Sequence, residues 1–266
     1  MKVIILCGGT GSRLVGAELP KPMVPIAGRP ILWHIMRGFS HWGFRDFVLC
    51  LGYRSDLFKH YFLNLPVMLS DVTLELGGEQ PVTIHGRSDE AGWRITLAET
   101  GHDSMTGCRV RRAAPDIPEG DDCFAVTYGD GVTDVDFRQV VAHHRASGKL
   151  ATVTAVHPPG RFGELQFDAH GSVVEFNEKP QTSAGWISGG FFVFSRAFLD
   201  RLPDDPGLVL EGEPLRALAR LGELSAYRHD GFWFCMDTPR DHRQLTEMAS
   251  APRPPWAVWE RGEERT

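Results

Sequence analysis

Apolar residues along the chain fall into short blocks that alternate between strand-like and helix-like spacing. Residues 3–6 are four consecutive apolar residues, which predicts a short buried strand. Residues 30–43 carry apolar side chains at helical spacing and end in a glycine, which predicts a helix. A second buried strand is predicted at 46–53 and a short helix at 55–64. This alternation predicts an α/β fold with a mixed, mainly parallel central sheet flanked by helices.

The alternation continues through the second half of the chain. The further predicted elements are a buried strand with an acidic turn at 123–134, a helix at 137–148, a strand at 150–156, a β-hairpin at 163–180, a strand at 189–195, a helix at 196–202, an amphipathic helix at 213–223 and a final pair of strands at 224–238. The sequence contains no internal repeat and no long linker, so we expect a single domain over residues 1–266.

Two segments depart from this alternation. Residues 66–112 contain short stretches of alternating apolar and polar residues, which predict an antiparallel β-hairpin insertion. Residues 251–266 form a tail rich in proline, tryptophan and charge, which we expect to pack loosely or against a partner.

The segment after the first strand has the composition of a phosphate-binding loop. Gly8, Gly9 and Gly11 allow the backbone to turn and to approach a ligand closely, and exposed N–H groups in such a turn attract anions. Arg13 and Lys21 add full positive charge. The loop lacks the Lys-Ser/Thr pair of a P-loop and the third glycine of a dinucleotide-binding turn. The alternative is a glycine-rich turn that only joins a strand to a helix.

Two aspartates follow predicted strands. Asp130 lies between two glycines after one strand, and Asp237 follows an aromatic-rich strand. The carboxyl ends of parallel strands form the ligand crevice of an α/β sheet, where two carboxylates can hold Mg²⁺. Aspartate in such positions also serves as a helix N-cap or turn former.

Other polar residues leave alternatives open. Ser104, Thr106 and Arg109 lie in a glycine-punctuated segment that either hydrogen-bonds a base edge or forms a solvated loop. The tripeptide 178–180 either contacts a sugar phosphate or is an exposed turn. We expect the adjacent histidines 143 and 144 to lie on the surface without a catalytic role.

Composition and charge narrow the class of protein. The chain has 266 residues, a mass of 29.6 kDa and a formal net charge of −6, which argues against a nucleic-acid partner. No apolar run is long enough for a membrane span, and the chain begins with a core strand rather than a signal peptide. The five scattered cysteines have no paired spacing for zinc and predict reduced thiols in the cytoplasm.

Several short motifs occur in order along nearly the whole chain: GGTGSR with KPM, ILWHIM, SDVTLEL, TGHDSMTGCRVRR, TYGDGV, PPGRFGEL, FNEKP, GGFFVF, GFWFCMDTPRD and PWAVWE. With these motifs the chain resembles the sugar-1-phosphate nucleotidyltransferases, and in particular their cytidylyl-transferring branch. The resemblance implies a Rossmann-like nucleotidyltransferase fold, Mg²⁺ as cofactor and a homo-oligomer. It also implies a reaction in which CTP and α-D-glucose 1-phosphate give CDP-glucose and pyrophosphate.

The resemblance also assigns roles to individual residues. Arg13, Lys21 and Asp130 would be catalytic, and Asp130 and Asp237 would hold the metal. The nucleotide would contact Leu6, Cys7, Gly8, Gly9, Thr10, Gly11, Ser12, Arg13, Lys21, Ser104, Arg109 and Gly129, with Ser104 and Arg109 acting partly across a subunit boundary. The sugar phosphate would contact Gly163, Glu178, Lys179 and Gly190.

Three positions in the predicted sugar half depart from the pattern of this family. Ser188 stands where asparagine is expected, Glu164 where a small residue is commoner, and Asn177 where glutamine is usual. The extra carboxylate of Glu164 and the shorter amide side chain of Asn177 could change which sugar phosphate fits the site. One alternative is therefore a nucleotidyltransferase with another sugar phosphate or nucleotide. A separate alternative is a catalytically silent nucleotide-binding subunit, which would be expected to lose Arg13, Lys21 or an aspartate, and all of these are present.

Overall fold

The computed structural model describes residues 1–10, 19–77, 82–86, 90–158, 164–167, 172–177 and 185–260. Six predicted site residues lie outside these ranges: Gly11, Ser12, Arg13, Gly163, Glu178 and Lys179.

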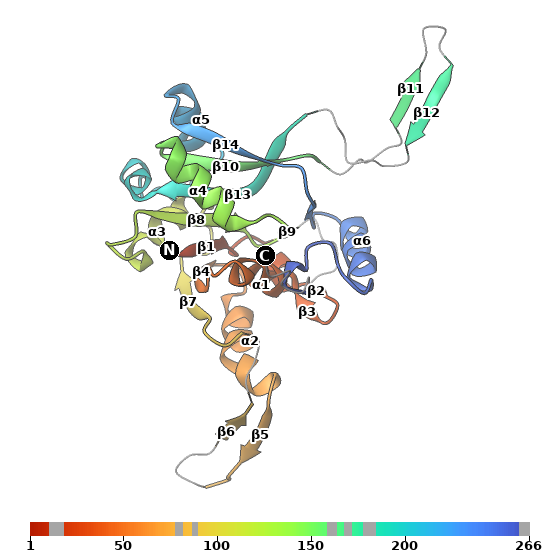
Figure 1. The fold of residues 1–266 in the computed structure, drawn as a ribbon. Coiled ribbons are helices and arrows are strands. Elements are labelled where there is room, and N and C mark those ends of the chain that lie inside the picture. The colour runs from red at the N-terminus through yellow and green to blue at the C-terminus, as the bar shows by residue number, and fades with distance from the viewer. Residues whose placement is uncertain are drawn as a thin grey trace.

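A seven-stranded mixed sheet forms the centre of the molecule (Figure 1). Its strands, in spatial order, are β14 (Leu224–His229), β10 (Ala151–Val156), β13 (Ile187–Ser195), β8 (Cys123–Tyr128), β1 (Val3–Leu6), β4 (Asp46–Leu51) and β7 (Arg94–Glu99). β13 runs antiparallel to both of its neighbours, and the other pairs are parallel. The prediction of a mixed, mainly parallel sheet is confirmed.

Helices cover both faces of this sheet. They are α1 (Ile31–His41), α2 (Ser55–Met68), α3 (Thr106–Arg112), α4 (Phe137–Ser147), α5 (Glu213–Arg220) and α6 (Pro239–Ala249), with short 3₁₀ helices η1 (Lys21–Met23), η2 (Ala114–Asp116), η3 (Arg196–Arg201) and η4 (Val258–Glu260). Four two-stranded ribbons complete the structure: β2 (Pro25–Ile26) with β3 (Arg29–Pro30), β5 (Asp71–Leu74) with β6 (Val82–His85), β9 (Gly131–Thr133) with β15 (Trp233–Cys235), and β11 (Glu164–Phe167) with β12 (Val173–Asn177).

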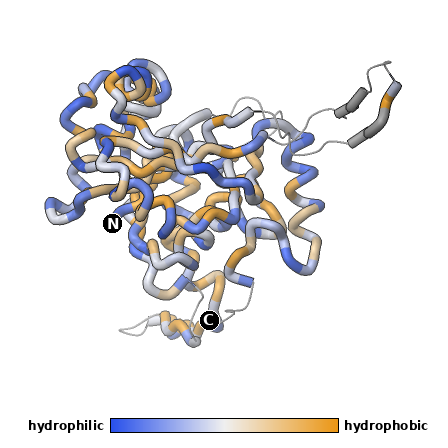
Figure 2. Tube along the Cα trace, turned by 45° about the horizontal axis from the view of Figure 1, so that its top comes forward, coloured by the Kyte–Doolittle hydropathy of each residue, from blue (hydrophilic) through white to orange (hydrophobic). Residues whose placement is uncertain are grey.

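The apolar run of β1 is buried on both sides because successive side chains of a strand point to opposite faces. Val3 and Ile5 belong to the core under α1 and α4, whereas Ile4 and Leu6 belong to the core under α3 and α5. In the first core Phe39 of α1 stacks on Phe137 of α4 with ring centroids 3.7 Å apart. Much of the hydrophobic trace accordingly runs through the middle of the molecule (Figure 2).

The prediction for residues 66–112 is correct only for its first part. β5 and β6 do form an antiparallel hairpin. β7 instead pairs in parallel with β4 and forms an edge of the central sheet, and residues 106–112 are helix α3. Alternating strands look the same in the sequence whether they join a local hairpin or a distant strand, so the pattern does not distinguish the two pairings.

Two predictions for the C-terminal part are wrong. The strands of 224–238 do not pair with each other: β14 pairs with β10, and β15 pairs with β9. The described part of the tail, residues 251–260, is packed rather than loose, because Trp256 is 1% exposed and lies in the first core. Helix α6 between them was not predicted.

One of the adjacent histidines of α4, His144, also differs from expectation. His144 is buried and lies between the hydroxyls of Thr152 and Ser195, at 3.0 and 3.1 Å. Its partners come from β10 and β13, which the sequence of α4 does not reveal.

Within the part of the chain that the structure describes, no helix is long and apolar enough to cross a lipid bilayer.

Candidate functional site

The candidate site lies at the carboxyl ends of the adjacent parallel strands β1 and β8. Leu6 at the end of β1 lies opposite Tyr128 at the end of β8. After β1 the chain continues to β4 on one side of β1, whereas after β8 it continues to β10 and β13 on the other side. The connections that follow these two neighbouring strands therefore diverge. Divergence of this kind opens a crevice at the strand ends, where ligands of α/β folds bind. Gly8 follows β1 and Asp130 follows β8 at this crevice.

Lys21 lies between the two predicted metal-binding carboxylates. Its Nζ donates to Asp237 Oδ1 at 2.6 Å and to Asp130 Oδ2 at 3.2 Å. Lys21 begins η1, where Pro20 and Pro22 restrict the backbone on both sides. The structure therefore brings together three predicted residues that are more than 100 positions apart in the sequence.

Charge and burial act together in this cluster. Burial raises the pKa of Asp130, although the Lys21 ammonium opposes that shift. Burial alone would lower the pKa of Lys21, but its hydrogen bond to Asp237 and the charge of both aspartates outweigh burial and raise it. Lys21 is therefore a firmly protonated cation at neutral pH.

Helix α6 holds Asp237 in place. Thr238 and Asp241 form a capping box at the start of α6, and the Asp241 carboxylate also accepts the Asp237 backbone N–H at 3.1 Å. This contact fixes the backbone that carries the Asp237 side chain. The Thr-Pro-Arg-Asp sequence after Asp237 is a capping-box signal that could have predicted α6.

A glycine permits the close packing around Lys21. A side chain at Gly129 would place its Cβ 2.6 Å from Cγ of Pro22, the residue after Lys21. Gly129 therefore allows η1 to pack against the turn that carries Asp130. This contact supplies a structural reason for the glycine besides the predicted contact with the nucleoside.

Arg109 is a buried support of the loop after β1. Its guanidinium nitrogens donate to Gly8 O at 3.0 Å, Leu51 O at 2.8 Å, Gly101 O at 2.9 Å, His102 O at 3.2 Å and Thr100 Oγ1 at 2.9 Å. Leu51 is the last residue of β4, and the other groups lie just beyond β1 and β7, so one side chain ties three strand ends together. A Cβ on Gly8 would lie 2.0 Å from Arg109 Nη1, which explains the glycine.

Ser104 and Thr106 are also bonded within the protein. Ser104 donates to Thr100 O at 2.7 Å and accepts from Arg112 Nη1 at 2.9 Å. Thr106 donates to Glu211 at 2.9 Å. Ser104 and Arg109 are therefore buried rather than solvated, and the predicted contact of this segment with a nucleotide stays a prediction.

The other described site residues take different positions around the crevice. Leu6, Cys7 and Gly8 are buried, and Gly9 and Thr10 are exposed. Gly190 of β13 has φ +77°, and a Cβ there would meet the Tyr128 ring at 2.7 Å, so glycine is required by both backbone and space. Ser188 Oγ accepts the backbone N–H of Gly190 at 3.3 Å.

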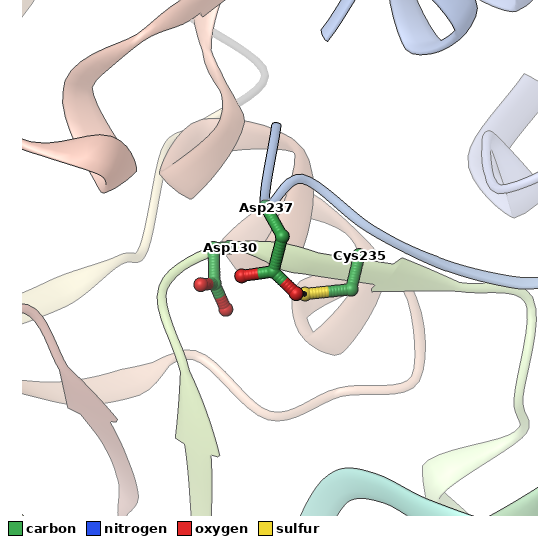
Figure 3. Close-up of side chains that lie close together, drawn as sticks. All are labelled: Asp130, Cys235 and Asp237. Carbon is green, nitrogen blue, oxygen red and sulfur yellow. Dashed lines mark hydrogen bonds between the residues drawn. The ribbon is translucent and has the colours of Figure 1, made fainter. Parts of the chain in front are cut away.

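Cys235 is a member of the site that sequence reasoning missed. The potential metal-ligand atoms of Asp130, Cys235 and Asp237 all lie within 4.8 Å of one another, and the three side chains lie close together in Figure 3. Cys235 donates to Asp237 Oδ2 at 3.7 Å, and burial raises the pKa of its thiol. Its position two residues before Asp237 was the available signal, because i and i+2 share a face of a strand.

The donor set fits a divalent cation. Two carboxylates, Asp130 and Asp237, and the Cys235 thiol lie close together around the ammonium of Lys21. Carboxylate oxygens are the ligands that hard divalent cations prefer.

A family model described as nucleotidyl transferase matches residues 2–209. The chain belongs to the nucleotidyl transferase family. It is 45% identical over 262 residues to the glucose-1-phosphate cytidylyltransferase of Salmonella typhi, covering 98% of this chain and 100% of that protein. It is 39% identical to the probable glucose-1-phosphate cytidylyltransferase of Bacillus subtilis (strain 168), with 97% and 100% covered.

A solved structure shows the same fold. HddC from Yersinia pseudotuberculosis superposes with a TM-score of 0.65 at 21% identity, covering 92% of this chain and 98% of that chain. The fold of this chain is thus shared by a protein of low sequence identity. Divalent metals are typical of this family, as are nucleotide and sugar phosphate substrates.

Proposed function

We propose that this nucleotidyl transferase converts CTP and α-D-glucose 1-phosphate into CDP-glucose and pyrophosphate. The observation that carries the proposal is the 45% identity, over nearly its full length, to a glucose-1-phosphate cytidylyltransferase. The cluster of Lys21, Asp130 and Asp237 at the ends of β1 and β8 supports it with suitable chemistry.

The reaction calls for positioning and charge neutralisation. An oxygen of the sugar phosphate attacks the α-phosphorus of CTP in line, and pyrophosphate leaves. No protein nucleophile is required for such a transfer. In the proposal, the backbone from Leu6 to Arg13 surrounds the nucleotide, Arg13 contacts the triphosphate, and the protonated Lys21 bridges the reacting phosphates.

We infer that the metal is Mg²⁺ and that Asp130 and Asp237 hold it. A bound Mg²⁺ would neutralise charge on the triphosphate and on the leaving pyrophosphate. Both side chains are held by structured elements: Asp130 by the turn between β8 and β9, and Asp237 by the α6 cap. The ammonium of Lys21 forms ion pairs with both carboxylates, so the position between them attracts positive charge.

The nucleoside and sugar contacts complete the proposal. In the proposal Gly129 contacts the nucleotide, and Ser104 and Arg109 help to select and hold it through the loop after β1 that Arg109 supports. Gly163, Glu178, Lys179 and Gly190 would line the sugar phosphate site. In support of this, Gly190 closely approaches Tyr128, the last residue of β8, and Asp130 follows β8 two residues later.

Two further expectations concern assembly and location. We propose a homo-oligomer that uses the β5–β6 hairpin, which lies beyond the end of α2 and away from the central sheet in Figure 1. Val72 pairs with Ile84 and Leu74 with Val82, so one face of this hairpin is apolar and exposed. We also propose that the protein acts in the cytoplasm, since its five cysteines are free thiols.

A substrate panel tests the proposed function. Pyrophosphate release would be measured for CTP, UTP, dTTP and GTP, each with several sugar 1-phosphates. The expected result is the highest kcat/KM for CTP with α-D-glucose 1-phosphate. A preference for another pair would replace the substrate assignment, and no turnover with any pair would favour the silent nucleotide-binding subunit.

A further inference from the structure

Cys235 adds a soft ligand to a site that otherwise offers oxygen. The thiol donates to Asp237 Oδ2 at 3.7 Å, on the side away from the oxygen that Lys21 contacts. Together with Asp130 and Asp237 it forms a set of three ligand atoms within 4.8 Å of one another (Figure 3). Small side-chain rotations would bring such atoms to the spacing that a single cation requires.

The three side chains stand on elements that fix their relative positions. Cys235 ends β15 and lies opposite Gly131 of β9, the residue after Asp130. The backbone N–H of Met236 donates to Asp130 O at 2.9 Å, which ties the two segments together beside the carboxylates. Asp237 follows two residues after Cys235 and is held by Asp241. The thiol is thus part of the same rigid frame as the carboxylates.

Cations differ sharply in how they use such a set. Mg²⁺ binds oxygen and gains little from sulfur. Zn²⁺ and other thiophilic cations bind Cys sulfur at about 2.3 Å and carboxylate oxygen at about 2.0–2.2 Å, usually with four ligands. Two carboxylates and one thiol would leave a single position open on a four-coordinate cation, whereas an octahedral Mg²⁺ held by two carboxylates keeps four.

We propose that Cys235 makes the metal site of this chain a three-ligand trap for thiophilic divalent cations, which bind there in competition with Mg²⁺ and block nucleotidyl transfer. The inference rests on the proposed roles of Asp130 and Asp237 as metal ligands. When the sulfur–metal bond forms, the S–H bond breaks and the proton passes to the buffer. The bound cation has too few open positions for the oxygens of the substrates, so activity is lost.

Titration of the full-length protein with Cd²⁺ tests this proposal directly. Sulfur-to-cadmium charge transfer in the ultraviolet reports the bond without any substrate, and calorimetry gives the affinity. Cys235→Ser should abolish the absorption and weaken Cd²⁺ binding by at least about tenfold. Loss of a residue that only supports a ligand lowers metal affinity by about that factor, and loss of the ligand itself should lower it at least as much. Mn²⁺ binding to the same variant, followed by electron paramagnetic resonance, should persist.

A matched control variant is provided by Cys108→Ser. Like Cys235, Cys108 donates to a carboxylate, that of Asp204, at 3.5 Å. Among the described residues, however, it belongs to no group of three potential metal ligands. Its replacement should leave the cadmium absorption unchanged. Asp237→Asn should weaken both Cd²⁺ and Mn²⁺ binding. Circular dichroism would confirm that each variant is folded, and Cys235→Ala provides a second removal of the thiol.

The outcomes separate this proposal from the proposed function. An unchanged cadmium affinity in folded Cys235→Ser and Cys235→Ala, or no charge-transfer absorption in the wild type, would overturn the thiophilic trap. Cadmium binding that depends on Cys235 would support it even if the substrate panel gave another nucleotide or sugar. In the wild type, added Mg²⁺ should shift the cadmium titration to higher concentrations if the two cations compete.

Discussion

At the scale of single residues, the site depends on a few charged side chains held by many neutral contacts. Lys21 is positioned by two carboxylates and two flanking prolines, and Arg109 by carbonyls from three strand ends. Each side chain therefore has a defined location before any substrate binds, which reduces the reorganisation required during the reaction.

Removal of either member of the Lys21–Asp130 pair should greatly reduce turnover. We expect Lys21→Ala and Asp130→Ala each to lower kcat by at least about a hundredfold, as for the loss of a preorganised electrostatic group. Steady-state pyrophosphate release is the measurement. Lys59→Ala is the control, because Lys59 is a surface lysine that also pairs with a carboxylate, Glu99. Near-normal turnover in a folded Lys21 or Asp130 variant would contradict the proposed mechanism.

Replacement of Arg109 should destabilise the loop after β1. Arg109→Lys has too few donors in the wrong geometry for the carbonyls at the ends of β1, β4 and β7, so buried acceptors are left unsatisfied. We expect the free energy of unfolding in urea to fall by about 2–3 kcal/mol. Arg111→Lys, on the exposed side of the same helix, should change it little. Equal stability of the two variants would argue against the supporting role of Arg109.

At the scale of elements, the C-terminal tail is joined to the first helix through a histidine. In α1, His34 Nε2 lies 2.9 Å from Ile26 O. Trp256 Nε1 lies 3.3 Å from the other ring nitrogen, His34 Nδ1. The indole can only donate, so Nδ1 accepts and Nε2 carries the proton. Burial lowers the pKa of His34 and likewise that of His144.

These two histidines predict a loss of stability in mild acid. Above pH 6.5 both are neutral in the folded and unfolded states, and their contribution to stability is fully present. As the pH falls through about 6.5 the unfolded state binds protons that the folded state does not, so the free energy of unfolding decreases. Urea unfolding at pH 7.5 and 5.5 measures the change. His34→Gln should reduce the pH dependence, whereas His60→Gln, on the exposed side of α2, should retain it.

At the scale of the whole molecule, the β5–β6 hairpin exposes an apolar face that suits the proposed homo-oligomer. Leu74, Val82 and Ile84 are 60%, 44% and 44% exposed on one face, while Thr73 and Thr83 occupy the other. An isolated two-stranded hairpin has little stability of its own in water. Burial of this apolar face against other copies of the chain would provide it.

Charge on the apolar face of the hairpin should therefore dissociate the assembly. We expect wild-type protein to exceed the 29.6 kDa of one chain in size-exclusion chromatography with light scattering, and Leu74→Glu with Ile84→Glu to shift it towards that mass. Thr73→Glu, on the polar face, is the control that should leave the mass unchanged. A wild-type protein of monomer mass would refute the homo-oligomer.

By itself the sequence determined most of the local structure and the type of chemistry. Apolar runs and helical spacing predicted β1, β4, β8, α1 and α4, because side-chain burial on one or two faces leaves a periodic pattern. The glycines after β1 and the aspartates after two strands predicted an anion and metal site. The motifs predicted the family, and the comparisons confirmed it.

Only the tertiary structure decided which distant segments meet. Strand pairing depends on backbone hydrogen bonds between remote residues, so the partners of β7, β14 and β15 were not visible in their own sequences. The same holds for the site. Lys21, Asp130 and Asp237 converge because the start of η1 and the ends of β8 and β15 meet at one crevice. Cys235 becomes a possible ligand only through the pairing of β15 with β9.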